Sequence, residues 1–368
     1  MNDKIKILIV DDSALMRRAL KEIIMTDPGL DVVGTARDGS DALEKVRELK
    51  PDVVTMDINM PVMDGLTAMQ YILSDYPEIA VLVVSSLTAE GALTTFEALE
   101  LGAFDYVAKP SGTVSADIHI IGREIIQKVK LAYKSVNGKS IRDRAERRSM
   151  ATPQKKVEPI RQSELTKGKK CTKVVVIGIS TGGPGTLMEV IPMLPENLGA
   201  AVIIIQHMPP TFTASFAKRL DGASLIPIKE AGPGDILQNG RGYLGPGGYQ
   251  LVVRGAGGAL RLPSTPKTVF MPCVNVTMES VLAAFGGENV IGVLMTGMGD
   301  DGADAMVKIR KAGGITIAED QSTAVVFGMP KEAIERGGAE IVVPSYKIAE
   351  AIIKAVRRIS STNNLVKE

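Results

Sequence analysis

The 368-residue chain contains no tryptophan, only two cysteines and only two histidines. Cys171 and Cys273 lie far apart in the sequence, a pattern that favours a reducing compartment over a disulfide framework. His119 and His207 are too few for a metal site with several histidine ligands. Each histidine can therefore be weighed on its own as a candidate for acid–base chemistry.

A strong charge of either sign and long apolar runs are also missing. The formal net charge is +1, which gives no overall bias toward nucleic acid or an anionic membrane. No apolar run reaches the roughly 18 residues of a transmembrane helix. The N-terminal apolar stretch has only six residues and ends in two aspartates, unlike a signal peptide. These features predict a cytoplasmic protein without nucleic-acid binding or membrane insertion.

Strand and helix patterns alternate along residues 1–133. Short apolar stretches typical of strands occur at 5–10, 31–36, 52–57, 81–86 and 105–110. Amphipathic stretches typical of helices separate them, at 14–25, 39–49 and 91–101. This alternation predicts a first α/β domain with a doubly wound parallel sheet.

The composition changes at residues 134–172. Between 134 and 170 there are twelve Lys or Arg, four Asp or Glu and no aromatic residue, and the few apolar residues lack a period. We interpret this segment as an exposed basic linker. A nucleic-acid-binding tail is the alternative, but the acidic residues and the lack of interleaved aromatics disfavour it.

A second α/β pattern occupies residues 173–368. Continuous apolar stretches at 174–179, 201–206, 289–295, 314–319 and 339–344 are typical of parallel strands buried on both faces. The glycine-rich segment 232–253 instead predicts turns and β-hairpins inserted into this domain. The expected architecture is therefore a mainly parallel, doubly wound sheet with a β-hairpin insertion.

Polar residues follow several strands of the first domain. Asp11 and Asp12 follow the first strand, Asp57 the third, Ser85 the fourth and Lys109 the fifth. In an open parallel sheet these positions lie along one edge. Three converging carboxylates suit a hard cation such as Mg²⁺, and a lysine with a hydroxyl suits an incoming phosphoryl group. An aspartate in that setting can accept the phosphoryl group.

These residues resemble the receiver domain of two-component response regulators, which has a flavodoxin-like fold. The matching motifs are VDDS (10–13), DINMPVMDG (57–65), Ser85 and YVAKP (106–110). The resemblance implies phosphorylation of Asp57 by a histidine kinase. It implies Mg²⁺ held by Asp12, Asp57 and the Asn59 carbonyl, with Asp11 assisting.

The same resemblance implies a set of residues that sense the phosphoryl group. Ser85 and Tyr106 would form the switch pair, and Lys109 would contact the phosphoryl oxygens. The spacing between Ser85 and Lys109 leaves Ser86 as a second candidate for the hydroxyl.

The second domain has a serine in a glycine-rich turn, in the sequence GISTG (178–182). This pattern places Ser180 on a sharp strand-to-helix turn, where a nucleophile can lie beside free backbone N–H groups. Such a turn can equally bind phosphate at the helix N-terminus. The lack of a GKS or GKT sequence disfavours a P-loop, and Ser180 replaces the second glycine of a dinucleotide fingerprint. The residues alone leave nucleophile and anion-binding loop as alternatives.

A serine nucleophile requires a base and an orienting acid. His207 follows the strand 201–206 and is the only histidine of the second domain, so it is the only candidate imidazole base there. His119 has no nucleophile nearby in the sequence, and we interpret it as structural. Asp300 and Asp301 lie in a glycine-rich turn after the strand 289–295, and chemistry alone does not choose between them.

Residues 173–357 resemble the catalytic domain of the chemotaxis receptor methylesterases. The motifs are GISTGGP (178–184), QHMPPTFTASFAKRL (206–220), YLGPGGYQLVV (243–253), LMTGMGDDGADAM (294–306) and VVFGMPKEA (325–333). The resemblance implies Ser180 as nucleophile, His207 as general acid and base, and Asp301 rather than Asp300 as the orienting carboxylate. Thr181 and the Met298 N–H would help to bind substrate and the oxyanion.

The family implies an activity and its partners. The enzyme would hydrolyse glutamyl methyl esters on methyl-accepting chemoreceptors, deamidate receptor glutamines, need no cofactor at the esterase site, and take its phosphoryl group from the chemotaxis histidine kinase. Three other functions are alternatives: a DNA-binding response regulator, a hydrolase of another acyl substrate, and a phosphate-binding adaptor without catalysis. The second domain is too large and too rich in strands for the first of these.

Overall fold

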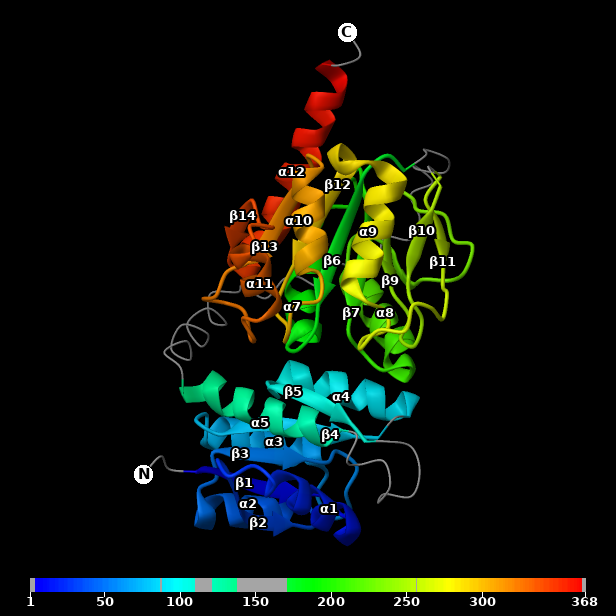
Figure 1. The fold of residues 1–368 in the computed structure, drawn as a ribbon. Coiled ribbons are helices and arrows are strands. Elements are labelled where there is room, and N and C mark those ends of the chain that lie inside the picture. The colour runs from blue at the N-terminus through cyan, green and yellow to red at the C-terminus, as the bar shows by residue number, and fades with distance from the viewer. Residues whose placement is uncertain (1–3, 87, 110–120, 138–170, 256, 366–368) are drawn as a thin grey trace. The chain divides into compact units, whose positions relative to one another are not determined.

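The computed structural model describes residues 4–86, 88–109, 121–137, 171–255 and 257–365 (Figure 1). The chain divides into two compact units, Met1–Gln154 and Lys155–Glu368. The last helix of the first unit continues to Asn137, past residue 133 where the sequence pattern places the end of the receiver. Most of the expected linker, together with Pro110 and His119, lies outside the described residues.

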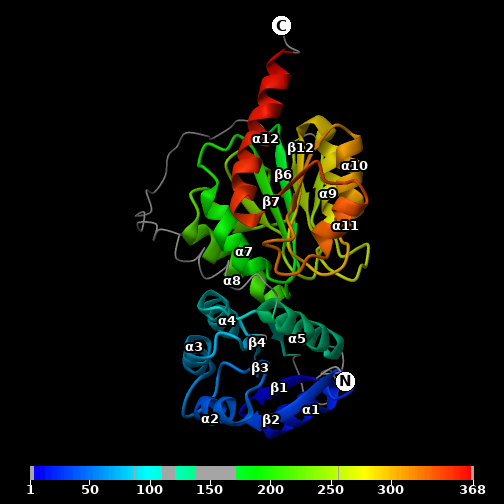
Figure 2. The same ribbon diagram turned by 90° about the vertical axis from the view of Figure 1, so that its left-hand side faces the viewer.

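The first unit is a five-stranded parallel sheet in the order β2-β1-β3-β4-β5. Its strands are β1 (Ile5–Val10), β2 (Leu30–Ala36), β3 (Val53–Met56), β4 (Ala80–Ser85) and β5 (Asp105–Ala108). Its helices are α1 (Ala14–Ile24), α2 (Gly39–Leu49), α3 (Gly65–Asp75), α4 (Ala89–Leu101) and α5 (Gly122–Asn137). Figure 2 shows α1 and α5 on one face of the sheet and α2, α3 and α4 on the other. This arrangement confirms the flavodoxin-like prediction.

Short polar side chains cap the N-termini of α1 and α3. Ser13 accepts a hydrogen bond from the Met16 N–H at 3.4 Å and caps α1, and Asp64 caps α3 through the Thr67 N–H at 2.8 Å. Such caps stabilise a helix by about 1 kcal/mol each. Because both helices begin a few residues after a buried strand, the caps fix the loops that carry the strand-end aspartates.

The second unit is built on a seven-stranded sheet in the order β14-β13-β12-β6-β7-β9-β8, and each of its strand pairs is parallel. Its strands are β6 (Val174–Ile179), β7 (Ala201–Gln206), β8 (Ile228–Glu230), β9 (Gly242–Leu244), β12 (Val290–Leu294), β13 (Ile315–Glu319) and β14 (Ile341–Val343). Strands β6, β7, β12 and β13 are buried along their whole length, as their continuous apolar sequences predict.

Helices cover both faces of this sheet, with α7, α8 and α12 on one face and α9, α10 and α11 on the other (Figure 2). Their bounds are α7 (Gly183–Val190), α8 (Pro210–Ala223), α9 (Val274–Phe285), α10 (Ala303–Lys311), α11 (Met329–Glu335) and α12 (Ser345–Leu365), with 3₁₀ turns η1 (Ile191–Met193) and η2 (Gly287–Asn289). Within the described ranges, no helix is both long and apolar enough to cross a bilayer.

The glycine-rich segment 232–253 is only partly what its sequence predicts. Strands β10 (Val252–Arg254) and β11 (Ala259–Arg261) form the expected antiparallel hairpin. Strand β9, however, joins the main sheet and runs parallel to β7, so the reading of this stretch as turns and hairpins alone is wrong. A three-residue strand has too little sequence to show a period, and β7 provides the hydrogen bonds that hold it.

Strand β6 lies at the centre of the sheet, between β7 and β12. After β6, the chain adds β7 on one side of it and later adds β12 on the other side. The direction in which strands are added to the sheet therefore reverses at β6. In open α/β sheets, ligands bind at the carboxyl ends of the strands at such a reversal. Ser180, the first residue after β6, lies at this point.

Val62, in the loop between Asp57 and α3, has an unfavourable backbone conformation. Its φ of 68° lies in the left-handed region, and its side chain is 88% exposed, so little packing compensates the strain. For a β-branched residue this region is a genuine outlier. The strain lowers the stability of the first unit.

We expect Val62→Asn to stabilise the first unit by about 1 kcal/mol, because asparagine tolerates the left-handed region better than valine does. Urea unfolding of the full chain measures the change. Val62→Thr is the matched control, because threonine keeps the β-branch and should bring no gain. Equal stability of the two variants would contradict the strain argument.

Candidate active site and acidic receiver site

Ser180 lies on a tight turn between β6 and α7. Its N–H donates to the Thr296 carbonyl at 2.9 Å, and its carbonyl accepts from the Gly183 N–H at 2.8 Å. Gly182 has a φ of 74°, and a Cβ there would lie 2.5 Å from the Val325 side chain. Only glycine fits both conditions, so the sequence around Ser180 enforces the sharp strand-to-helix turn that the GISTG pattern predicts.

His207 lies beside Ser180 at the end of the neighbouring strand. Ile179 pairs with Gln206 in the β6–β7 register, and the His207 N–H donates to the Ile179 carbonyl at 3.1 Å. The buried Gln206 side chain donates from Nε2 to the carbonyls of both Ser180 and His207, each at 3.0 Å. Gln206 therefore ties the two strand ends together, a role that sequence reasoning missed.

The imidazole of His207 is hydrogen-bonded to Asp301. His207 Nε2 lies 2.9 Å from Asp301 Oδ2, and the two side chains are 6% and 10% exposed. The other ring nitrogen, Nδ1, is buried and has no hydrogen-bond partner in the described part of the chain. The imidazole is therefore oriented the opposite way from the one in the serine-protease template, in which Nδ1 faces the carboxylate. Nδ1 is the nitrogen left to accept a proton.

The structure places the hydrogen-bonded pair of His207 and Asp301 at the strand ends beside Ser180, but it shows no hydrogen bond between the described Ser180 hydroxyl and His207. Catalytic hydrogen bonds are often long or poorly aligned without substrate and tighten only in the reacting complex. Ser180 and His207 directly follow Ile179 and Gln206, which are paired in the β6–β7 register, so both residues lie at the same edge of the sheet.

Asp301 is held at the N-terminus of α9. Its carboxylate accepts the N–H groups of Val274 at 2.8 Å and Asn275 at 2.9 Å, and the Cys273 thiol donates to Oδ1 at 3.1 Å. Burial works to raise the pKa of Asp301, but the hydrogen bond and charge of His207 and the hydrogen bonds from Asn275 and Cys273 lower it on balance. Burial, with the Asp301 charge nearby, raises the pKa of the Cys273 thiol to about 12.

The neighbouring Asp300 is placed differently. Its carboxylate is 61% exposed and forms an ion pair of 2.6 Å with Arg336, which also contacts Asp304 and Glu332. The sequence chemistry alone left open which of the two aspartates pairs with the histidine. In the structure, Asp301 reaches the His207 ring, whereas Asp300 pairs with Arg336.

A buried glutamate, Glu319, supports the Ser180 turn through Thr296. Glu319 is fully buried at the end of β13, and its carboxylate accepts the Thr296 N–H at 2.8 Å and the Thr323 hydroxyl at 3.0 Å. Thr296 in turn accepts the Ser180 N–H and donates its hydroxyl to the Thr181 carbonyl at 2.9 Å. From the sequence, a glutamate at a strand end is expected to be exposed to solvent. The sequence therefore did not predict that Glu319 supports this turn.

Thr181 and Met298, the two residues expected to help with the oxyanion and substrate, flank Ser180 in different ways. Thr181 follows it directly and is buried, and Met298 is half-buried in the turn after β12. The neighbouring Gly297 approaches Ser180 closely, because a Cβ at Gly297 would lie 2.9 Å from the Ser180 Cβ. The β12 turn and the Ser180 turn are thus in contact, while the roles of Thr181 and Met298 stay predictions.

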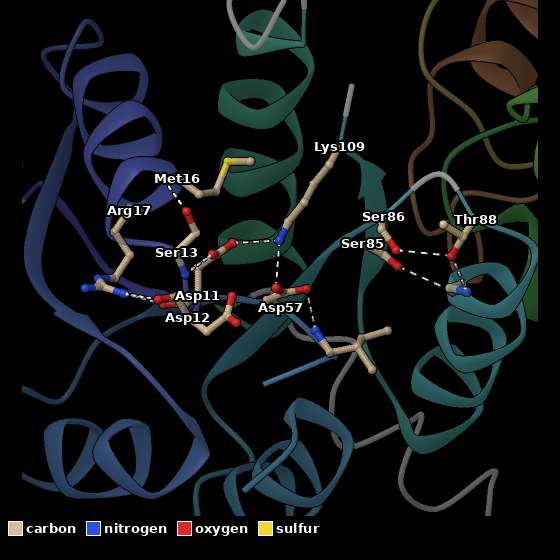
Figure 3. Close-up of polar contacts among 12 residues, drawn as sticks. Asp11, Asp12, Ser13, Met16, Arg17, Asp57, Ser85, Ser86, Thr88 and Lys109 are labelled. Atoms are coloured by element: carbon tan, nitrogen blue, oxygen red, sulfur yellow. Dashed lines mark hydrogen bonds and ion pairs between the residues drawn. The ribbon is translucent and has the colours of Figure 1, made fainter. Parts of the chain in front are cut away.

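The first unit gathers its own charged residues at the carboxyl ends of its strands. Figure 3 shows Lys109 reaching toward Asp11 and Asp57, with Nζ–oxygen distances of 2.8 Å and 2.7 Å. Burial raises the pKa of Asp57, and Lys109 offsets only part of this effect. Burial acts against the charge of Lys109, but the two carboxylates raise its pKa on balance.

The acidic residues of this site fit a hard cation. Carboxylate oxygens of Asp11, Asp12 and Asp57 lie within 4.8 Å of one another, and oxygen ligands of this kind suit Mg²⁺. Asp12 and Asn59 are exposed, whereas Asp11 and Asp57 are buried. Burial raises the pKa of Asp57, because it disfavours the charged carboxylate, and a bound cation would stabilise that charge.

Of the expected switch residues, Ser85 ends β4 and Tyr106 lies within β5. Ser85 is buried and its hydroxyl donates to the Gly91 carbonyl at 3.3 Å, whereas Ser86 is half-buried and lies 3.3 Å from the Thr88 hydroxyl (Figure 3). Tyr106 is buried, with the Lys128 ammonium 5.3 Å from its ring centroid. In this conformation no hydrogen bond between described residues links Ser85 or Ser86 to Asp57.

The lowered pKa of Asp301 predicts a pH dependence of stability. A carboxylate with a depressed native pKa contributes stability that is complete above its ordinary value of 3.8 and is lost as the pH falls through the native value. We therefore expect Asp301→Asn to be about 1–3 kcal/mol less stable than wild type at neutral pH, with the gap shrinking below about pH 4.

Urea unfolding as a function of pH measures this gap. Asp300→Asn is the matched control, because its exposed ion pair with Arg336 contributes at most about 1 kcal/mol. A gap between wild type and Asp301→Asn that is equally wide at pH 3 and pH 7 would show that the Asp301 charge is not responsible.

Comparisons with known proteins match both units of the chain. The family model for CheB methylesterase matches residues 175–352, and the model for the response regulator receiver domain matches residues 7–117. The Thermotoga maritima CheB methylesterase catalytic domain is 43% identical with a TM-score of 0.48, covering 50% of this chain and 97% of that one.

Two relatives match over nearly the whole chain, and both are called protein-glutamate methylesterase/protein-glutamine glutaminase. The protein from Caldanaerobacter subterraneus subsp. tengcongensis is 51% identical over 368 residues, covering 99% of this chain and all of the relative. A protein from Syntrophomonas wolfei is 53% identical over 360 residues, covering 96% of this chain and all of the relative. The chain therefore belongs to the chemotaxis protein-glutamate methylesterase/protein-glutamine glutaminase family, with a receiver domain in front of the catalytic domain.

Proposed function

We propose that the enzyme acts through Ser180, His207 and Asp301 and that phosphorylation of Asp57 activates it. The observation that carries the catalytic part is the buried His207–Asp301 hydrogen bond of 2.9 Å, with the second ring nitrogen left unpartnered among the described residues at the strand end beside Ser180. A nucleophile, a base within reach and an acid that orients the base are the three parts of a triad.

The substrate is a γ-glutamyl methyl ester on the cytoplasmic helical region of a chemoreceptor. His207 takes the Ser180 proton as the serine oxygen forms a bond to the ester carbonyl carbon. The resulting oxyanion is held by backbone N–H groups of the glycine-rich turns, with Met298 and Thr181 as the candidates; losing one such donor costs about 3 kcal/mol. His207 then gives its proton to the departing methoxide, and methanol leaves.

Hydrolysis of the glutamyl-enzyme completes the cycle. His207 removes a proton from water, the water oxygen attacks the acyl carbon, and the proton returns to Ser180 as the glutamate is released. A glutamine side chain follows the same course with ammonia as the leaving group, which accounts for the deamidase activity. Asp301 keeps the ring tautomer and stabilises the imidazolium formed in each transfer.

Activation begins at the receiver. Asp57 would accept the phosphoryl group from the chemotaxis histidine kinase, and Lys109, already within 2.7 Å of Asp57, would contact its oxygens. Asp11, Asp12, Asp57 and the Asn59 carbonyl would hold Mg²⁺, which supplies positive charge for the phosphoryl oxygens. The esterase site needs no cofactor in this scheme.

Ser85 and Tyr106 would carry the signal onward, with Ser86 as the alternative hydroxyl. For Ser85 this requires exchanging its hydrogen bond with Gly91 for one with a phosphoryl oxygen. We propose that the unphosphorylated receiver blocks receptor access to Ser180 and that phosphorylation relieves the block. The enzyme would work in the cytoplasm, where its receptor substrate and kinase are found.

Methanol release from methylated receptor membranes, with and without a small phosphodonor, tests both parts. Ser180→Ala should lose at least about 10⁴-fold in rate, because no nucleophile remains. Asp57→Ala should keep the basal rate and lose a stimulation of about 10- to 100-fold. Methanol release by Ser180→Ala at the wild-type rate would exclude the acyl-enzyme route.

The proposed block has its own test. Removing residues 1–133 should raise basal methanol release, because the receiver would no longer shield the Ser180 edge. A basal rate unchanged by the deletion would contradict the block while leaving the catalytic scheme intact. Release of methanol from a small methyl ester at the same efficiency as from receptor membranes would favour a less specific hydrolase.

A further inference from the structure

The motif YLGPGGYQLVV (243–253) has no part in the proposed reaction, yet one of its residues is among the most buried polar side chains of the second unit. Gln250 is 0% exposed and lies between β9 and β10. A buried amide is costly unless its donors and acceptor are all used. Its hydrogen bonds therefore indicate what the motif holds in place.

Gln250 holds the loop of residues 263–273, which connects β11 to α9. Its N–H donates to the Pro263 carbonyl at 2.9 Å, and its side-chain Nε2 donates to the Pro266 carbonyl at 2.9 Å and to the Thr268 hydroxyl at 2.8 Å. Its Oε1 accepts the Cys273 N–H at 2.9 Å. One buried side chain thus fixes the middle and the end of the 263–273 loop.

The 263–273 loop places an aromatic ring on the catalytic imidazole. The Phe270 ring stacks on the His207 ring with centroids 4.0 Å apart and an angle of 8° between the planes. Phe270 itself is anchored, since its carbonyl accepts the Thr268 hydroxyl that Gln250 also contacts. Phe270 has no function in the sequence motifs, because only the folded loop brings it to His207.

The same motif also contacts the turn that follows His207. A Cβ at Gly247 would lie 2.6 Å from the Pro210 nitrogen and 2.7 Å from the Met208 carbonyl oxygen, so the backbone of the motif packs directly against the turn that follows His207. The motif therefore braces both the turn that carries the imidazole and the loop that covers it.

An imidazole held by one hydrogen bond can still rotate about that bond and about its terminal side-chain torsion, which has broad minima. Asp301 fixes the position of Nε2, but it does not fix the plane of the ring. A parallel aromatic ring 4.0 Å away does fix the plane, because rotation out of it would bring the two rings into collision. The direction of Nδ1 then follows from the two constraints together.

We propose that Phe270, held by Gln250, is a positioning residue that sets the plane of the His207 ring, so that Nδ1 faces Ser180 while Nε2 stays on Asp301. The inference rests on the triad proposed above and deepens it. It gives the glycine-rich motif a task in catalysis, exerted through His207 rather than through contact with substrate.

Phe270→Leu removes the flat ring but keeps an apolar side chain. We expect kcat for methanol release from methylated receptor membranes to fall about tenfold with KM within about twofold, because the receptor contacts remain while the imidazole is misaligned. Phe270→Tyr keeps the stacking face and should restore most of kcat. Val269→Ala, at the 92% exposed neighbouring position, is the matched control and should behave as wild type.

Nuclear magnetic resonance of the labelled histidines measures the stacking directly. A general loss of protein stability would not change the chemical shifts of the His207 imidazole protons in the folded protein. The chain has only two histidines, and a stacked phenyl ring shifts the imidazole proton signals of His207 upfield. The shift should persist in Phe270→Tyr and Val269→Ala and be lost in Phe270→Leu. Wild-type kcat in Phe270→Leu after loss of the shift would overturn the proposal, as would a loss of kcat in Phe270→Leu that Phe270→Tyr does not restore.

Gln250→Ala tests the link between the motif and the ring. Because it would release the 263–273 loop, it should lower kcat in the same direction as Phe270→Leu, and the double variant should be little slower than Gln250→Ala alone. If the fold-losses in kcat of the two single variants multiplied in the double variant, Gln250 would not act through Phe270. Ser180→Ala separates this inference from the proposed function: activity in that variant defeats the triad, whereas an inactive Ser180→Ala with a fully active Phe270→Leu defeats only the role of Phe270.

Discussion

The arrangement of the candidate active site depends on one carboxylate, that of Asp301. It is buried, and it would be unfavourable there without the first N–H groups of α9 and the ring of His207 to compensate its charge. The helix N-terminus also contributes a favourable dipole. Asp301 can therefore stay ionised in a buried place and orient a histidine, while Asp300, exposed and paired with Arg336, cannot.

Sheet topology brings the three parts of the site together. The strand order reverses at β6, so Ser180, His207 and the turn that carries Asp301 all follow strands that lie side by side. Glycines make this approach possible, since a side chain at Gly182 or Gly297 would collide with its neighbours. The receiver carries different side chains at the same edge of its own parallel sheet, where Lys109 forms ion pairs with Asp11 and Asp57.

The sequence predicts much of this arrangement because strands buried on both faces are continuous apolar runs, and the residue after each run lies at the functional edge. The placement of Ser180, His207 and Asp301 follows from that rule and from the resemblance to the methylesterases. The roles of Gln206, Glu319 and Phe270 could not be found this way, because they depend on which strand or loop each residue meets in three dimensions. Glu319 and Phe270 lie in none of the quoted motifs, and Gln206 begins one without any sign of which carbonyls its side chain contacts. Strand β9 was missed for the same reason.

Serine hydrolases whose catalytic residues act as a unit show strongly non-additive losses when those residues are removed. The most direct test of the central claim compares methanol release by Ser180→Ala with release by the double variant Ser180→Ala/Asp301→Ala. If Asp301 acts only by serving the base that activates Ser180, the double variant should be no slower than Ser180→Ala. A further large loss in the double variant would show that Asp301 contributes by another route and would contradict the triad.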